Sequence, residues 1–448
     1  MNNRITDMTE GKPLRLIMVF MLPLLAGNIF QQFYNMVDSL VVGRFVGKTA
    51  LASVGACSSV NFLFFALGAG LGNGIGVVAA QYFGGGRYEK LKTTIGNSFI
   101  VLSVISAIVG LFGFLIAKPL LRFLNTPETV LNGAVTYLRV TSLGLLGVSL
   151  YNGVSSILRA LGDSKAPLYF LIFCSVMNAI LDLFFVIVMH LGVFGVAIAT
   201  IIAQYCSAVI SIVYAFRKIS FFDLNRKYFV PDWQVISNSV RIGIPLVMQN
   251  ALIAVSSIVL QSVTNSFGDS VVAAFTVTCR VETLVHQPYG SIASAVTTFT
   301  GQNIGAGNPN RVKTAFKQCA VIITGISLVM GIMMFLWGRE IIRFFVKDPE
   351  VIEIGYVGLK ITGIFFLPLG MIYLPRALIN GCGDSNFAMV NGFVEVACRI
   401  LFSKLFVYFG LFGFYSIWIT TGITWLITGV VCCVRYMQGR WMTAGSIA

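Results

Sequence analysis

The segment PLLAGNIFQQFYNMVDSLVVGRFVG, residues 23–47, decides how the rest of the chain is interpreted. Pro23 lies within an apolar run, where it removes a helix hydrogen bond and therefore predicts a hinge in the segment. Fifteen residues later, Asp38 places a carboxylate among Phe, Tyr, Met, Leu and Val side chains. A charged carboxylate in hydrocarbon costs about 2.5 kcal/mol or more unless it is protonated, paired or hydrated. Asp38 is therefore a candidate functional residue; the alternative is an acid that only anchors a helix end at the membrane interface.

The composition places the whole chain in a membrane. Hydrophobic residues make up 57% of the 448 residues, and charged residues make up only 11%. Soluble domains carry about 25% charged residues, so we expect an integral membrane protein in contact with the lipid bilayer. The formal net charge of +14 would suggest a nucleic-acid partner for a soluble protein. Here it indicates basic loops on one side of the membrane, and no nucleic-acid partner is expected.

The hydrophobic pattern predicts an all-α protein with twelve transmembrane helices of about 20 residues or more each. The expected spans lie near residues 14–42, 50–80, 95–117, 133–158, 168–190, 194–217, 236–263, 271–298, 315–337, 353–379, 388–408 and 412–435. An even number of spans puts both termini on the same side of the membrane.

Lysine and arginine residues indicate which side that is. Nineteen of them fall on the side of the N-terminus and seven on the other side, while the remaining five lie in or at the ends of spans. Basic loops stay in the cytoplasm, so both termini are predicted to be cytoplasmic. We expect a multi-pass protein of a bacterial-type plasma membrane.

The chain contains an internal repeat with a constant offset of 221 residues. Residues of the first half recur in the second half as the pairs Gln81/Gln302, Gly84/Gly305, Gly86/Gly307, Lys92/Lys313 and Gly162-Asp163-Ser164/Gly383-Asp384-Ser385. Pro23 recurs as Pro245 at an offset of 222. The repeat predicts an N-terminal lobe (1–217), a cytoplasmic linker (218–235) and a C-terminal lobe (236–448). Six spans per lobe give both lobes the same orientation, so a pseudo-two-fold axis along the membrane normal and a transporter architecture are expected.

Several motifs resemble those of the multidrug and toxic compound extrusion (MATE) transporters. They are Tyr34-Asn35-Met36-Val37-Asp38, Gln81-Tyr82-Phe83-Gly84, Gly301-Gln302-Asn303-Ile304-Gly305, the repeated Gly-Asp-Ser, and the pair Asn178 and Asp182. The resemblance covers essentially the whole chain. It implies a secondary active antiporter that exports organic cations, amphiphilic drugs or metabolites from the cytoplasm in exchange for H⁺ or Na⁺, without another cofactor.

The candidate ion-coupling residues lie in the N-terminal half. Asn178 and Asp182 are four residues apart, so both lie on one face of the fifth span. The resemblance implies that Asn152 and Thr200 gather with them around Asp38. Two neighbouring carboxylates raise each other's proton affinity, whereas the same oxygens with Asn and Thr would also hold Na⁺. The alternative is that Asn178 and Asp182 only hydrogen-bond to neighbouring helices.

A second group of residues is a candidate for contact with the transported compound. Phe30, Gln31 and Tyr34 in the first span, with Phe62 in the second, predict an aromatic cavity for organic cations. Aromatic side chains that face lipid are the alternative.

Two further patterns favour structural roles. In the C-terminal half, Glu395 precedes Arg399 by four residues and Glu282 lies beside Arg280, so we expect each acid to be neutralised within its own span. In the second span, five glycines alternate with other residues at positions 68, 70, 72, 74 and 76. They predict close helix packing, with a gating bend as the alternative.

Two other classes of membrane protein remain as alternatives. A flippase for lipid-linked saccharides or other amphiphiles would require a cluster of cationic residues facing a cavity. A membrane enzyme or channel would require a nucleophile–base set or a repeated pore loop, and the sequence contains neither. We therefore expect a transporter rather than an enzyme, acting as a monomer.

Overall fold

The computed structural model of the chain describes residues 5–41, 45 and 47–442, apart from the side chains of residues 37–41 and 48. This part of the chain is helical and contains no strand. Its longer helices are α1 (Pro13–Val41), α2 (Lys48–Ala56), α3 (Ser58–Gly84), α4 (Tyr88–Phe123), α5 (Glu128–Ala160), α6 (Lys165–Leu183), α7 (Gly192–Lys218), α8 (Trp233–Thr264), α9 (Asp269–Gly305), α10 (Pro309–Phe345), α11 (Pro349–Ile364), α12 (Phe366–Gly381), α13 (Asn386–Tyr408) and α14 (Ser416–Met437).

These helices confirm the predicted all-α, multi-span fold class. Each of the twelve predicted spans overlaps a long helix or, in one case, the bent pair α11 and α12. In the described part of the chain, nine helices are long and apolar enough to cross a membrane, and the bent pair makes a tenth. The other two long helices, α9 and α13, contain charged residues, which lower their hydropathy.

The tenth predicted span is broken. Its two helices, α11 and α12, meet at an angle of 48° at Phe365. Pro368 follows three residues later, and it has no N–H to donate to the carbonyl of Ile364. The helix therefore ends before the proline and restarts in a new direction.

The described residues form two compact units. Unit 1 contains residues 5–9 and 22–247, and unit 2 contains residues 10–21 and 248–442. Both boundaries cut through a helix, α1 after Met21 and α8 after Val247. Pro23 and Pro245 each lie within two residues of the nearer boundary. The lobe boundaries predicted from the sequence stay a prediction.

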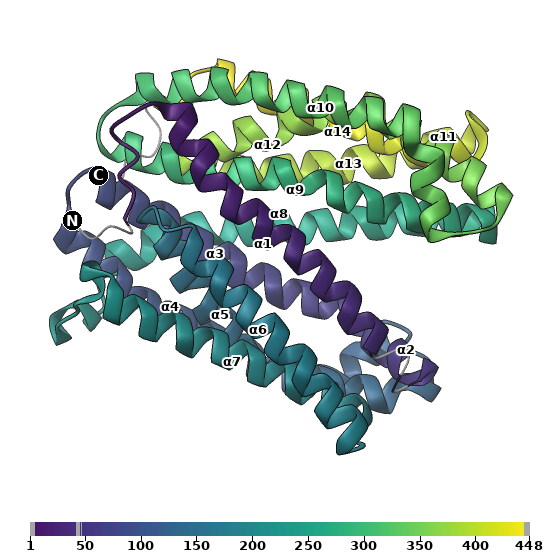
Figure 1. Cartoon of the computed structure of the whole chain (residues 1–448), viewed down its shortest axis with the longest axis horizontal. Helices are drawn as coiled ribbons and strands as arrows, with labels where there is room; N and C mark the ends of the chain where they lie inside the picture. The colour runs from purple at the N-terminus through teal and green to yellow at the C-terminus, as the bar shows by residue number, and fades with distance from the viewer. Residues whose placement is uncertain (1–4, 42–44, 46, 443–448) are drawn as a thin grey trace. The chain divides into compact units, whose positions relative to one another are not determined.

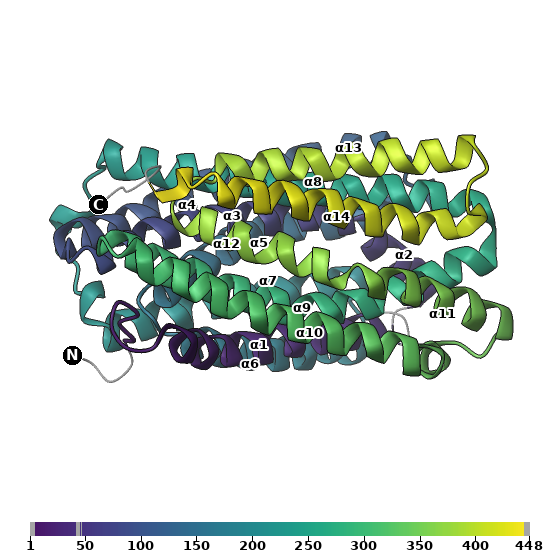
Figure 2. The same ribbon diagram turned by 90° about the horizontal axis from the view of Figure 1, so that it is seen from above.

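Within each unit the helices pack side by side. In unit 1, α5 packs against α3, α4 and α7, and α6 packs against α7 (Figure 1). In unit 2, α12 packs against α9, α10 and α14, and α13 packs against α14 (Figure 2).

The internal repeat is visible in the turns that end the helices. The backbone of Gly86 has φ 67° and that of Gly307 has φ 72°, a region that glycine adopts most readily. In the same two turns, the N–H of Arg87 donates to the carbonyl of Tyr82, and Asn308 donates to Asn303. All of these pairs keep the offset of 221, so the repeated glycines stop equivalent helices at equivalent positions.

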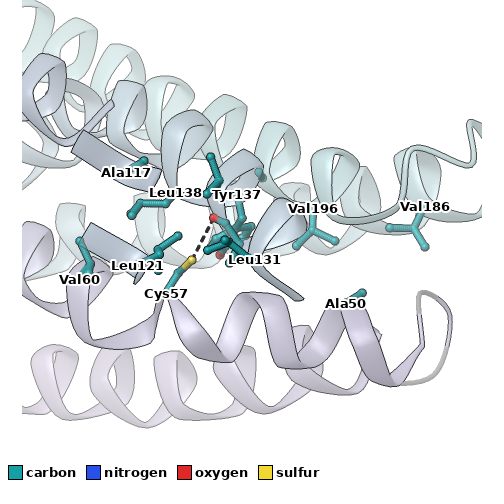
Figure 3. Packing of buried hydrophobic residues seen from close by; sticks show 13 residues of the cluster. Ala50, Cys57, Val60, Ala117, Leu121, Leu131, Tyr137, Leu138, Val186 and Val196 are labelled. Atoms are coloured by element: carbon teal, nitrogen blue, oxygen red, sulfur yellow. Dashed lines mark hydrogen bonds between the residues drawn. The ribbon is translucent and has the colours of Figure 1, made fainter. Parts of the chain in front are cut away.

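The second predicted span begins later than expected, because residues 48–56 form the separate short helix α2. Cys57, at the junction of α2 and α3, is completely buried, and its Sγ donates to the carbonyl of Ala134 at 3.2 Å (Figure 3). The hydroxyl of Ser53 donates to the carbonyl of Val130 at 3.1 Å. Both bonds fasten α2 and the start of α3 to α5.

The alternating glycines of α3 form two close helix contacts. A Cβ at Gly72 would lie 3.0 Å from the backbone of Asn152 in α5. A Cβ at Gly74 would lie 2.5 Å from the backbone nitrogen of Gly243 in α8. The alternation therefore supplies small residues to opposite faces of α3, and the prediction of close packing is confirmed.

The linker between the halves is fixed to α4. The amide nitrogen of Asn97 donates to the carbonyls of Tyr228 and Val230, both at 3.1 Å, and its oxygen accepts from the N–H of Asp232 at 2.9 Å. Lys90 pairs with Asp232 at 3.0 Å, and this ammonium lowers the pKa of the Asp232 carboxyl. Residues 228–232 are therefore part of the folded structure of unit 1 rather than a free tether.

We expect Gly74→Ala to destabilise the protein, because the added methyl group would collide with the backbone of Gly243. Overpacking of this kind costs about 1–3 kcal/mol. The melting temperature of the purified protein in detergent measures the loss. Gly325→Ala in α10 is the control, since a Cβ there meets no atom within 4 Å. A Gly74→Ala protein as stable as this control would contradict the close packing of α3 and α8.

Candidate functional site

The centre of the candidate site is one face of α6. Asn178 and Asp182 lie one helical turn apart, and they are 1% and 0% exposed. Directly after Asp182 the α-helix changes into a π-helical turn, η2 (Phe184–Val188), in which the N–H of Met189 donates to the carbonyl of Phe184. Single π turns occur often at functional sites, because they shift the helix register locally. The buried acid therefore lies at the end of the regular part of its helix.

Tyr34 of α1 contacts this face. Its hydroxyl donates a hydrogen bond to Oδ1 of Asn178. The amide nitrogen of Asn178 has no hydrogen-bond partner among the residues that the structure describes. Tyr34 is predicted from the sequence as a cavity residue, and the structure adds that it contacts the amide of the predicted ion site.

Asp38 lies in α1, one turn after Tyr34. Its side chain is outside the part of the chain that the structure describes. Residues four apart share a helix face, so the backbone of Asp38 is on the face of α1 that carries Tyr34. The juxtaposition of Asp38 with Asp182 stays a prediction.

Asn152 and Thr200 make hydrogen bonds within their own helices. The amide of Asn152 donates to the carbonyl of Val148 at 2.9 Å, and the hydroxyl of Thr200 donates to the carbonyl of Val196 at 2.9 Å. These bonds do not connect either residue to α6. Their membership of the site, like the suggested Na⁺ ligation by Asp38, Asn178, Asp182 and Thr200, stays a prediction.

The predicted cavity residues are at least partly exposed. Phe30, Gln31 and Tyr34 are partly exposed on α1, and Phe62 is 41% exposed on α3. The amide of Gln31 donates to the side chain of Asn35 at 3.0 Å. Side chains that face lipid and side chains that face a transported compound are both exposed in an isolated chain, so this assignment stays a prediction.

In unit 2, one expected ion pair is confirmed and the other is wrong. Glu395 and Arg399 pair at 3.4 Å inside α13, and both side chains are buried. Among the described residues Glu282 forms no ion pair within 4 Å; the charge of Arg399 acts on it from a greater distance, and Thr362 lies near it. Arg280 is exposed on the far side of α9, because residues two apart on a helix do not face each other.

The repeat explains how Glu282 is held. At the offset of 221, Glu282 corresponds to Asn61 and Thr362 corresponds to Thr141. In unit 1, the hydroxyl of Thr141 donates to Oδ1 of Asn61 at 3.1 Å. The two units therefore place equivalent residues near each other, with an amide in unit 1 and a carboxylate in unit 2.

Sequence reasoning missed three residues near these acids in unit 2, namely His286, Tyr373 and Arg376. The same offset could have found them, since unit 1 has Phe65, Asn152 and Ser155 at the equivalent positions.

Comparison with known proteins identifies the family. The sequence model of the MatE family matches residues 23–184 and 245–405, which together make up most of the chain. The chain belongs to the MatE family. Each matched stretch begins at one of the repeated prolines, so the family pattern occurs once in each half of the chain.

Relatives of known name agree with this assignment. The probable multidrug resistance protein YpnP of Bacillus subtilis is 29% identical over 97% of each chain. The multidrug export protein MepA of Staphylococcus saprophyticus is 23% identical, over 94% of this chain and 92% of the relative. A solved structure, described as an outward-facing conformation of a multidrug resistance MATE family transporter, has a TM-score of 0.92 at 22% identity over 99% of each chain. The chain therefore has the MATE fold and belongs to a family of transporters rather than enzymes, as predicted.

We expect Glu395→Gln to destabilise this MATE protein, because Arg399 would lose the acid with which it pairs inside α13. Breaking one partner of a buried pair costs on the order of 3 kcal/mol. Protein yield and melting temperature measure the effect. Glu340→Gln is the matched control, since Glu340 pairs with Arg343 at 3.9 Å on the exposed face of α10 and should contribute less than about 1 kcal/mol. A normal melting temperature combined with loss of ion-driven transport would instead place part of the ion site in unit 2.

Proposed function

We propose that this MATE-family transporter exports organic cations, amphiphilic drugs or metabolites from the cytoplasm in exchange for H⁺. The proposal rests on one observation: Asp182 is completely buried in α6, one turn from an amide to which Tyr34 of α1 is hydrogen-bonded. A buried acid on one helix, adjoining a second helix that carries another acid, is the arrangement that proton coupling requires.

The free-energy cost of a charge in hydrocarbon supplies the coupling. A carboxylate costs about 2.5 kcal/mol or more in the membrane interior when it is ionised and unhydrated. Protonation removes that cost, so a conformation that buries the acid favours the protonated form and a hydrated conformation favours the ionised form. Proton binding and conformation are then linked, and a compound that prefers one conformation exchanges with the proton.

Helix α1 is the proposed moving element. Pro23 lies inside α1 and has no N–H for the carbonyl of Val19, so the helix is weakest at this point. Tyr34 and Asp38 both lie beyond that point on one face of the helix. A bend at Pro23 would change the position of both side chains relative to α6.

Na⁺ is the second candidate for the coupled ion. The hydroxyl of Tyr34, the amide oxygen of Asn178 and the carboxylate of Asp182 are hard oxygen ligands of the kind that Na⁺ accepts. Transport measured under a proton gradient alone, and separately under a sodium gradient alone, distinguishes the two ions.

We expect Asp182→Asn to abolish ion-driven export, with a decrease on the order of tenfold or more, because the amide imitates the protonated acid and cannot release a proton. Asp38→Asn should have the same effect, and the double variant should be little worse than either single variant. Uptake of an ethidium-like cation into inverted vesicles under an imposed gradient measures this. Asp223→Asn in the exposed linker is the control. Wild-type transport by Asp38→Asn at equal protein level would contradict the proposal.

The proposed direction of transport depends on the cytoplasmic location of both termini. In a cysteine-free background, single cysteines at Lys90 and Arg226 should react with a membrane-impermeant maleimide only after the cells are opened, since the Lys and Arg distribution places these loops inside. Cysteines at Glu128 and Asp348 should react in intact cells. The opposite labelling would reverse the direction of the whole scheme.

A further inference from the structure

Arg376 in α12 is a cation of unit 2 that forms no ion pair with the described residues. In the described part of the chain, no carboxylate oxygen lies within 4 Å of its guanidinium, whereas Arg399 pairs with Glu395. Arg376 is partly exposed, and it lies five residues before the end of α12 at Gly381. An arginine that is largely enclosed by apolar helices is costly to leave unpaired, so a partner supplied from outside the chain would stabilise it.

The guanidinium is nevertheless held in one orientation. Its Cζ lies 5.0 Å from the centre of the Tyr373 ring, one turn earlier in the same helix. With the Gln249 amide oriented so that its oxygen faces Arg376, this oxygen accepts from Nε at 3.2 Å and from Nη1 at 2.7 Å. The Nη2 group has no partner among the described residues. Arg376 is thus positioned but not neutralised, and a planar guanidinium with free N–H groups suits a bidentate oxygen ligand.

The residues that position Arg376 are themselves fixed. The hydroxyl of Tyr373 is hydrogen-bonded to Nδ1 of His286 at 3.0 Å, and the His286 ring packs edge-on against Tyr373 and Trp425. Gln249 is 5% exposed. A preorganised cation of this kind loses little side-chain entropy when it binds an anion.

The other charged groups nearby do not provide a partner for Arg376. The charges of Arg376 and Arg399 both act on His286, and those of Arg376 and Glu395 both act on Tyr373. Glu395 is committed to Arg399 at 3.4 Å. Glu282 also interacts with Arg399. Arg376 therefore lies beside these charged groups without a carboxylate within ion-pair distance among the described residues.

The repeat indicates that the fold does not need this arrangement. At the offset of 221, Arg376 corresponds to Ser155 and Tyr373 corresponds to Asn152, both in α5. The equivalent helix of unit 1 packs against its neighbours with these small, uncharged residues. The fold of this repeat therefore does not by itself require an arginine at this position.

We propose that Arg376 binds a carboxylate group of the transported compound, positioned by Tyr373 and Gln249. The inference rests on the proposed export function and narrows its substrate class to amphiphiles that carry a carboxylate, including zwitterions in which an aromatic cation is joined to an acid. The guanidinium donates hydrogen bonds to both carboxylate oxygens, and the partly exposed side chain of Tyr373 contacts the apolar part of the compound. In the proposed topology α12 ends at the cytoplasmic side, so Arg376 lies near the side at which the substrate enters.

The test compares two xanthylium dyes that differ only in a free carboxylate and its methyl ester. Fluorescence anisotropy with the purified full-length protein in detergent measures the binding of each dye. We expect the wild-type protein to bind the acid about tenfold more tightly than the ester, in line with a charge-assisted hydrogen bond. Arg376→Gln should weaken binding of the acid about tenfold and leave binding of the ester unchanged. Arg376→Lys should recover part of the lost affinity for the acid.

Lys360→Gln is the matched control, because Lys360 is also a partly exposed cation of unit 2 that lies over a tyrosine ring, Tyr356, at 4.2 Å. It should leave the preference for the acid intact. The proposal would be overturned if the wild-type protein bound the two dyes with equal affinity or bound neither measurably. It would also be overturned if Arg376→Gln lost affinity for both dyes equally. The wild-type comparison is valid even if the Arg376 variants fold poorly.

Failure of the proposed function is recognised separately. If the wild-type protein prefers the acid but moves neither dye under a proton or sodium gradient in vesicles, the export proposal fails and the carboxylate site stands. If both dyes are exported equally, export stands and the carboxylate site fails.

Discussion

The cost of placing a charge in hydrocarbon is the constraint on which this structure depends. It keeps most charged residues in the loops, and it makes each exception inside a helix informative. In unit 1 one exception is Asp182, which is completely buried one helical turn from the amide of Asn178 that Tyr34 contacts. In unit 2 the exceptions include Glu395 and Arg399, which form a buried ion pair within α13.

The two copies of the repeat share a scaffold but differ in chemistry. Their helices end at equivalent turns, and an equivalent threonine lies near position 61 in one unit and position 282 in the other. Side chains that point into the packed helices were then free to diverge. In the scheme that we propose, the acid and amide groups of unit 1 couple the ion and the guanidinium of unit 2 binds an anionic part of the cargo. The two sides of the proposed exchange would then be assigned to different copies of the repeat.

The sequence alone predicted much of the fold. Each span is identified from the hydropathy of one continuous stretch of residues, and the repeat is identified from a constant offset between matching residues. The sequence predicted the face shared by Asn178 and Asp182 and the close packing of the α3 glycines for the same reason. It did not predict the break at Phe365, the separate helix α2, or the contact from Tyr34 to Asn178. These features depend on how each helix is rotated against its neighbours, which hydropathy does not specify. The expected pair of Glu282 with Arg280 was wrong because Arg280 lies on a different face of α9. Arg376 was not singled out from the sequence, although its surroundings make it distinctive.

The division of α1 and α8 between the compact units has a consequence for biosynthesis. The first copy of the repeat cannot finish folding when its sixth span leaves the ribosome, because residues 228–232 and the first half of α8 complete its surface. Residues 10–21 are in the opposite situation. They are synthesised near the start of the chain, but they belong to unit 2, which is completed last. The N-terminal part of α1 is therefore separated from the rest of its unit by more than two hundred residues of synthesis, since that unit resumes only at Met248.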